Sequence, residues 1–154
     1  MKRDLEKTMD DQKIEPTEPL ISIKNLEVKF INQDATVYAV NGVDIKLERG
    51  KVLTILGESG SGKSVTMRSI LRLLPPKATL SGSIIVDGEN VIEMSQDQLS
   101  NMRGRDVSMI FQEPMVAFDP VYKVGSQIAE TVVRHLGTSF DAALARAEEL
   151  FDLV

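Results

Sequence analysis

The stretch that most constrains the fold lies between residues 52 and 76. An apolar run, Val52–Leu56, leads directly into the glycine-rich loop GESGSGKS, residues 57–64. Apolar residues then recur at the spacing of an amphipathic helix until Pro75 and Pro76 end it. Because each glycine in an ordered segment costs about 0.5–1 kcal/mol relative to alanine, such a loop indicates a need for bare backbone. We therefore predict a buried strand, a backbone-lined loop and a helix in succession.

The loop matches the pattern G-x-x-x-x-G-K-[ST] through Gly57, Gly62, Lys63 and Ser64. Between a strand and a helix, this pattern predicts a phosphate site in which backbone N–H groups and the helix N-terminus face one anion. Lys63 is expected to reach the outer phosphates, and the Ser64 hydroxyl to bind Mg²⁺. The residues expected to contact the nucleotide are Gly57, Glu58, Ser59, Gly60, Ser61, Gly62, Lys63, Ser64 and Val65. We call residues 57–64 the phosphate loop.

Composition narrows the class of protein. The chain has 154 residues, of which 42% are hydrophobic and 27% charged, enough for one core. A net charge of −5 argues against a nucleic-acid partner, and the absence of cysteine excludes disulfides and thiolate metal sites. The first residues have no apolar core, and no run approaches the ~20 apolar residues of a membrane span, so we expect any membrane role to come through a partner. Residues 1–18 are predicted to be a flexible tail.

Strand-like patterns flank the phosphate loop. Apolar and polar residues alternate over residues 21–30 and again over 39–47, with a turn at Gly50 after them. These two segments predict an antiparallel layer with one solvated face. Residues 82–90 predict a further short strand that turns at Asp87, before Gly88. The fold class is therefore α/β: a core sheet typical of phosphate-loop NTPases with an N-terminal antiparallel layer.

The second half of the chain is predominantly helical in pattern. Residues 95–104 predict a short helix with Ser95 as its N-cap, and residues 106–111 predict a second buried strand. Two further helices are predicted over about 124–136 and 140–154. The apolar stripe of the last helix reaches the end of the chain without a stop signal, so we expect the chain to be cut inside a larger fold.

Several segments, in order, resemble the ATP-binding subunit of ABC transporters. VNGVDIKLERGKVLTILGESGSGKSVTMRSILRLLP is similar to the start of that domain, and GSIIVDGENV to the hairpin that follows it. MIFQEPMVAFDP, from Met109, resembles its Q-loop in the oligopeptide, dipeptide and nickel importer branch. The resemblance implies that residues 19–154 form the N-terminal part of an ATP-binding domain, with a Q-loop region over 109–124 and a helical subdomain from about 124. The implied activity is ATP hydrolysis coupled to solute import, with peptides favoured over nickel.

The resemblance also implies roles for single residues. Gln112 would act with Lys63 in catalysis, its amide oxygen reaching Mg²⁺ and the attacking water. Phe30 would stack on adenine, with Tyr38 as the alternative. Val65 stands where many members have a threonine, so only its backbone N–H can serve the phosphates.

Implied partners are transmembrane permease subunits, a second ATP-binding subunit and, indirectly, an extracytoplasmic solute-binding protein. The subunit would lie peripherally on the cytoplasmic face of the membrane. We expect the stretch from Gln112 to Val124 to dock the permease. The alternative is that its apolar side chains fold back into the helical subdomain. These side chains belong to Met115, Val116, Ala117, Phe118 and Val121.

Other motifs of the family do not occur in the sequence: the Leu-Ser-Gly-Gly-Gln signature, the Asp-Glu strand end and the switch histidine. We therefore expect the chain alone to bind nucleotide weakly and to hydrolyse it negligibly. The alternatives are a non-hydrolysing nucleotide-binding fragment, a GTPase or a small-molecule kinase, although the Asn-Lys-x-Asp motif of a GTPase is missing. Three residues imitate catalytic groups: Asp87 is expected in a turn, Glu113 in a loop, and His135 on a helix.

Overall fold

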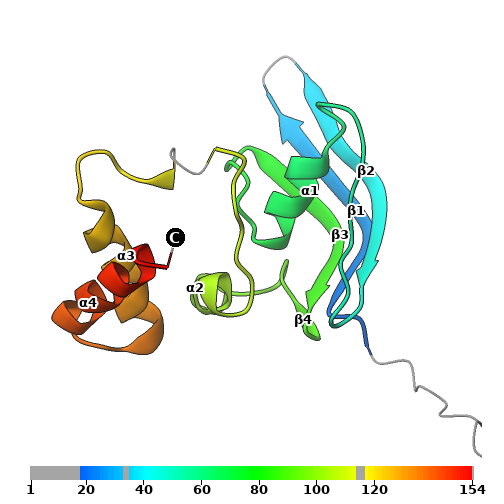
Figure 1. The fold of residues 1–154 in the computed structure, drawn as a ribbon. Helices are drawn as coiled ribbons and strands as arrows, with labels where there is room; N and C mark the ends of the chain where they lie inside the picture. The colour runs from blue at the N-terminus through cyan, green and yellow to red at the C-terminus, as the bar shows by residue number, and fades with distance from the viewer. Residues whose placement is uncertain (1–17, 33–34, 114–116, 154) are drawn as a thin grey trace, which may run out of the picture. The chain divides into compact units, whose positions relative to one another are not determined.

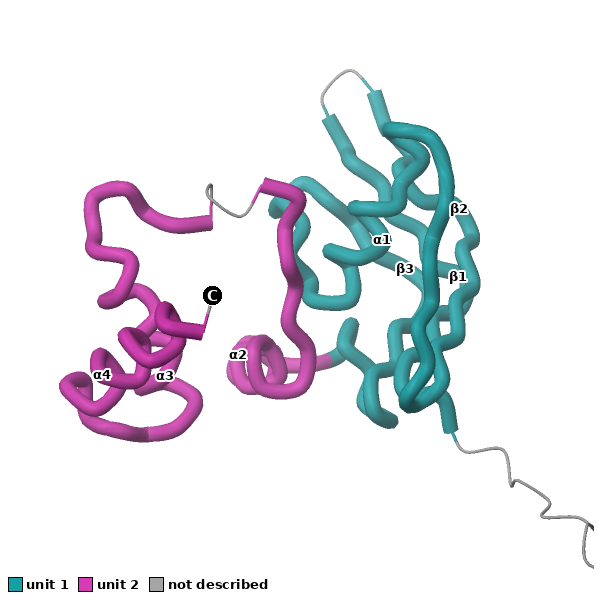
Figure 2. The backbone as a smooth tube through the Cα atoms, in the orientation of Figure 1, with its two compact units in different colours: residues 1–93 teal, residues 94–154 magenta. Residues whose placement is uncertain are grey.

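The structure is a computed structural model that describes residues 18–32, 35–113 and 117–153. The predicted tail therefore lies almost wholly outside the described residues. The chain divides into two compact units, residues 1–93 and 94–154, and each is described by itself (Figure 2). The first unit contains β1 (Ile21–Ile31), β2 (Thr36–Leu47), α1 (Lys63–Ile70), β3 (Ala78–Val86) and β4 (Glu89–Asn90). The second contains α2 (Gln96–Arg105), α3 (Val124–Leu136) and α4 (Phe140–Phe151).

The first unit is built on a four-stranded antiparallel sheet in the order β2-β1-β3-β4 (Figure 1). Side chains on one face of β1 and β3 are fully buried, among them Ile23, Leu26, Val28 and Ile84. The opposite face of the β1–β2 hairpin carries charged residues such as Glu27. This one-sided burial confirms the antiparallel layer that the alternating pattern predicted.

A bulge in β2 decides which side chains share a face of the β1–β2 hairpin. Val28 lies opposite Val40, but the next residue of β1, Lys29, lies opposite Tyr38. Ala39 is therefore the extra residue of the bulge. Because successive side chains of a strand point to opposite faces, the bulge places Tyr38 on the face away from Val40.

Helix α1 packs against β1, β2 and β3 and buries Ile70 and the adjoining Leu71. It ends at Ile70, five residues before Pro75, the first of the two prolines that were predicted to stop it. Arg72 adopts a left-handed conformation with φ of 48°, and the N–H of Leu73 donates to the Arg68 carbonyl at 2.9 Å. This turn satisfies a free carbonyl of the last helical turn, so the chain leaves the helix before Pro75.

The two predicted buried strands are absent from the described residues, and those predictions were wrong for this structure. Neither Val52–Leu56 nor residues 106–111 form a strand, and within the second run the described structure has only an isolated bridge between Val107 and Arg103. Val52 is 93% exposed, and Ile110 is also 93% exposed. The physical reason is that a strand needs a neighbouring strand to complete its hydrogen bonds. No segment that the structure describes forms a ladder with either run.

In the second unit, local signals predicted the helices well. Ser95 caps α2 through a capping box: its hydroxyl accepts from the Gln98 N–H, and the Gln98 side chain accepts from the Ser95 N–H at 2.8 Å. Regular helix stops before Gly104, which has φ of 85°. Helices α3 and α4 pack together through small residues, with Ala129, Ala143 and Ala147 fully buried. None of the helices that the structure describes could cross a lipid bilayer.

Candidate nucleotide-binding site

The phosphate loop turns tightly before it enters α1. The N–H of Ser61 donates to the Glu58 carbonyl at 3.3 Å, and Gly60 and Gly62 have φ of 81° and 90°. Helix α1 then begins at Lys63 with Gly62 as its N-cap, and no side chain caps it. The N–H groups of its first turn have no carbonyl within the helix to donate to, so they remain available for an anion.

Gly62 seats the phosphate loop directly on the sheet. A Cβ added at Gly62 would lie 2.4 Å from the carbonyl oxygen of Ala39 and 3.4 Å from the Val40 Cγ2 atom. Both Ala39 and Val40 belong to β2. A side chain at this position would therefore push the N-terminus of α1 away from β2, which explains the glycine at the sixth position of the motif.

The Lys63 ammonium lies inside the curve of the loop. Its Nζ donates to the Gly57 carbonyl at 2.7 Å, to the Glu58 carbonyl, and to the Ser61 hydroxyl at 3.2 Å. These acceptors are uncharged, so an entering phosphate would offer the Lys63 Nζ atom a stronger, charged acceptor. A phosphate in the loop would gain this cation together with the N–H donors of the first turn of α1.

The residues proposed to hold metal are divided between the units. Ser64 is exposed in the first turn of α1, and Gln112 is exposed in the second unit. Hydroxyl and amide oxygens are hard, neutral ligands that suit Mg²⁺ beside phosphate oxygens. Within the described ranges, no group of three or more acidic, histidine or cysteine side chains could hold a metal ion. A metal would therefore also need the phosphate oxygens as ligands. The Ser64 hydroxyl, in the first turn of α1, therefore has the chemistry of a ligand for Mg²⁺ that arrives with its nucleotide.

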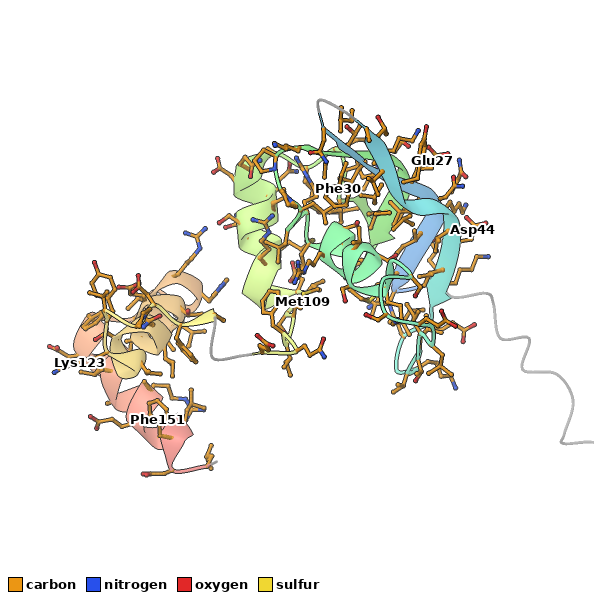
Figure 3. All side chains as sticks on the ribbon, turned by 90° about the horizontal axis from the view of Figure 1, so that it is seen from above. Glu27, Phe30, Asp44, Met109, Lys123 and Phe151 are labelled. Atoms are coloured by element: carbon orange, nitrogen blue, oxygen red, sulfur yellow. The ribbon has the colours of Figure 1, made fainter. Side chains whose placement is uncertain are left out.

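The two candidate adenine-stacking residues lie on different faces of the sheet. Phe30 pairs with Val37 and shares the face of Val28, the face on which Val40 approaches Gly62. Phe30 is half-buried, and Figure 3 shows it on a different side of the strands from Glu27.

Tyr38 lies on the outer face and is 59% exposed. The Lys29 ammonium sits 5.1 Å from the centre of its ring and 2.8 Å from the Glu27 carboxylate. This hydrogen bond from Lys29 lowers the pKa of Glu27 below its usual value. A charged cluster thus occupies one side of the Tyr38 ring.

The three residues that imitate catalytic groups lie where the sequence analysis placed them. Asp87 occupies the β3–β4 turn with φ of 48° and forms an ion pair with Arg49. Glu113 is exposed beside Gln112 in a loop. His135 is half-buried in α3 and packs on Gly104, where an added Cβ would lie 2.7 Å from its Nε2 atom.

Two groups that support the phosphate loop and the 119–122 turn were not predicted from the sequence. The Ala39 carbonyl supports the phosphate loop through backbone alone, so no side-chain pattern could reveal it. Gln127 in α3 hydrogen-bonds to the main chain of residues 119–122. Only the Asp-Pro pair at residues 119–120, a turn signal, hints at this arrangement in the sequence.

The comparisons with known proteins agree on one family. Residues 40–153 match the ABC transporter family. The oligopeptide transport ATP-binding protein OppD of Bacillus subtilis (strain 168) is 41% identical over 137 residues, covering 88% of this chain and 38% of the relative. The dipeptide transport ATP-binding protein DppD of the same organism is 40% identical over 139 residues, covering 89% of this chain and 42% of the relative. The chain thus spans about two-fifths of the length of these relatives.

A solved structure shares the fold. The ATP-binding cassette MJ0796, in a dimeric post-hydrolysis state with ADP and phosphate, aligns with a TM-score of 0.68 at 21% identity. The alignment covers 84% of this chain and 54% of that chain. The phosphate loop and the antiparallel sheet described above are therefore parts of a known architecture.

Proposed function

Because the chain belongs to the ABC transporter family, we propose that it is part of the ATPase subunit of a solute importer. ATP binding and hydrolysis by this subunit drive the import of a solute. The names of the oligopeptide and dipeptide transport relatives support peptides as the solute class. The observation that carries the proposal is the phosphate loop, in which Lys63 faces inward and Gly62 seats the start of α1 on β2.

Phosphate binding follows from the donors of the loop. The β- and γ-phosphates of ATP accept hydrogen bonds from the N–H groups at the start of α1. The helix dipole stabilises the same negative charge. Lys63 exchanges the carbonyls of Gly57 and Glu58 for phosphate oxygens, which are stronger acceptors because they are charged. Positioning and charge stabilisation supply most of the catalysis in phosphoryl transfer.

Metal binding and water activation involve Ser64 and Gln112. The Ser64 hydroxyl would be a ligand of the metal, and the Gln112 amide oxygen would be a further ligand and would orient the attacking water. A bound Mg²⁺ would neutralise charge that develops on the phosphates. The remaining loop residues, such as Ser59, and Val65, which follows the loop in α1, contribute through their backbone N–H groups.

Adenine stacking is assigned to Phe30. This ring shares a face of the sheet with Val28 and Val40, and Val40 approaches the phosphate loop at Gly62. Tyr38 lies on the opposite face beneath Lys29, so a base stacked there would lie across the sheet from the phosphate donors. The face that Phe30 shares with Val40 therefore favours Phe30 over Tyr38 as the stacking residue.

The partners in this proposal are permease subunits in the membrane, a second ATP-binding subunit and an extracytoplasmic solute-binding protein. The transport names of the relatives support permease subunits as partners, and the dimeric state of the solved cassette supports a second ATP-binding subunit. We propose that this assembly lies at the cytoplasmic face of the membrane. Within the docking stretch, Val121 is 83% exposed whereas Phe118 is half-buried. Met115 and Val116 lie outside the described residues. The permease contact therefore centres on Val121 and its neighbours.

Removal of the Lys63 ammonium tests the proposal. In the assembled transporter, Lys63→Ala should abolish ATP hydrolysis, because the phosphates lose the cation that the loop places among them. Lys51→Ala removes an exposed lysine six residues before the loop and is the matched control, expected to leave turnover unchanged. Phosphate release by both variants is the measurement. Normal turnover in Lys63→Ala would overturn the assignment.

A further inference from the structure

The Gln127 side chain binds the main chain of a turn that precedes its own helix. Its Oε1 atom accepts from the Asp119 N–H at 2.9 Å. Its Nε2 atom donates to the Asp119 carbonyl at 2.9 Å and to the Tyr122 carbonyl at 3.1 Å. Both amide hydrogens and the amide oxygen are thus used, and every partner is a backbone group.

The turn is also closed from within. The Asp119 carboxylate accepts from the Val121 N–H at 2.9 Å, and the Asp119 carbonyl accepts from the Tyr122 N–H at 3.3 Å. Pro120 restricts φ in the middle of the turn. Residues 119–122 therefore form a turn closed by its own hydrogen bonds, and Gln127 ties this turn to the start of α3.

This rigid turn holds two large side chains in solvent. Val121 is 83% exposed and Tyr122 is 66% exposed. The hydrogen bonds use main-chain atoms of residues 119, 121 and 122, so they fix the backbone from which both side chains project. Exposed apolar side chains on a pre-formed turn are typical of a contact surface, because little conformational entropy is lost when they bind.

We propose that Gln127 is a positioning residue for coupling: its amide fixes the 119–122 turn so that Val121 and Tyr122 meet the permease. The inference rests on the proposed function, which supplies the permease as the partner. It adds the residue that sets the geometry of the contact. Gln127 itself needs to touch neither nucleotide nor permease.

The first experiment measures amide hydrogen exchange in the 119–122 turn. Hydrogen-exchange mass spectrometry of a peptide covering residues 117–123, in the assembled transporter without nucleotide, reports the Asp119 and Val121 amides. Gln127→Glu keeps the shape of the side chain but cannot donate to the two carbonyls. We expect exchange in this peptide to rise about tenfold, since several hydrogen bonds fail together. Glu130→Leu, an exposed change on the same helix, is the control and should leave the peptide unchanged.

The second experiment measures coupling, which a merely structural role would not alter selectively. Gln127→Glu should lose the stimulation of ATP hydrolysis by an oligopeptide supplied with the solute-binding protein, while nucleotide affinity stays the same. Tyr122→Ala should have a similar effect, and the double variant should be no worse than either single variant, because both act through one contact.

The outcomes separate the inference from the proposed function. Unchanged exchange in Gln127→Glu would show that the amide does not hold the turn. Faster exchange with normal coupling, or fully additive effects with Tyr122→Ala, would overturn the link to the permease. In each case the ATPase assignment stands or falls separately, on Lys63→Ala. Faster exchange with lost coupling and non-additivity supports the inference.

Discussion

Gly62 and Ala39 lie in direct backbone contact: a Cβ added at Gly62 would come within 2.4 Å of the Ala39 carbonyl oxygen. The contact joins the end of the phosphate loop to β2 at the bulge that also sorts Phe30 and Tyr38 onto different faces. One short segment of β2 therefore supports the phosphate donors and orients the candidate base platform.

Two glycines of the loop allow a controlled test of this contact. Gly60 and Gly62 both have positive φ, so alanine at either position costs about 1–2 kcal/mol of backbone strain. Only Gly62 also has a close neighbour, since nothing lies within 4 Å of a Cβ added at Gly60. Gly62→Ala should therefore weaken ATP binding more than Gly60→Ala. Calorimetric titration of both variants is the measurement, and equal losses would show that the Ala39 contact is unimportant.

Substitution of each aromatic residue should distinguish the two candidate adenine platforms. Phe30→Ala should weaken ATP binding about tenfold, in the range of stacking contributions from single bases. Inorganic triphosphate, which has no base, should bind this variant as well as it binds the parent. Tyr38→Ala should leave both affinities unchanged, because its ring lies on the other face beneath Lys29. The reverse result in an ATP titration would transfer the role to Tyr38.

Ser64→Ala should affect nucleotide binding only when metal is present. The exposed hydroxyl is a metal ligand in the proposed site, whereas the phosphates are held by backbone N–H groups and Lys63. ATP affinity should consequently fall in Mg²⁺ buffer and stay unchanged in excess chelator. Paired titrations of the parent and variant in both buffers test this. An equal loss in the two buffers would mean that Ser64 contacts phosphate or supports the loop instead.

The 154-residue chain by itself should bind nucleotide weakly and hydrolyse it negligibly. The phosphate loop can receive ATP, but the family's signature motif and its Asp-Glu strand end do not occur in the sequence. Exposed apolar side chains at Val52, Leu56 and Ile110 also favour aggregation of the isolated chain. Phosphate release by the purified chain, measured beside a nucleotide titration, checks the prediction. Turnover comparable with that of complete ABC ATPases would instead identify a base within these residues and reopen the case for Glu113.

Features governed by neighbours in the sequence could be predicted from the sequence. The Ser95 capping box, the extent of α3 and the turn at Asp87 each depend on contacts within a few residues. The phosphate loop belongs to the same group, because the motif carries its own glycines, lysine and helix start. Alternation over β1 and β2 likewise predicted a sheet with one buried face, since period-two burial is a property of each strand.

Only the tertiary structure decided the features that depend on distant partners. The apolar run Val52–Leu56 has the composition of a buried strand, but strand formation requires a partner strand, and none pairs with it in the described chain. The bulge at Ala39, which puts Phe30 and Tyr38 on opposite faces, results from pairing between two strands and has no local sequence signal. The hydrogen bonds of Gln127 to Asp119 likewise join a helix to a preceding turn. Local propensity is a property of the sequence, whereas pairing and close approach arise only when separate segments meet in space.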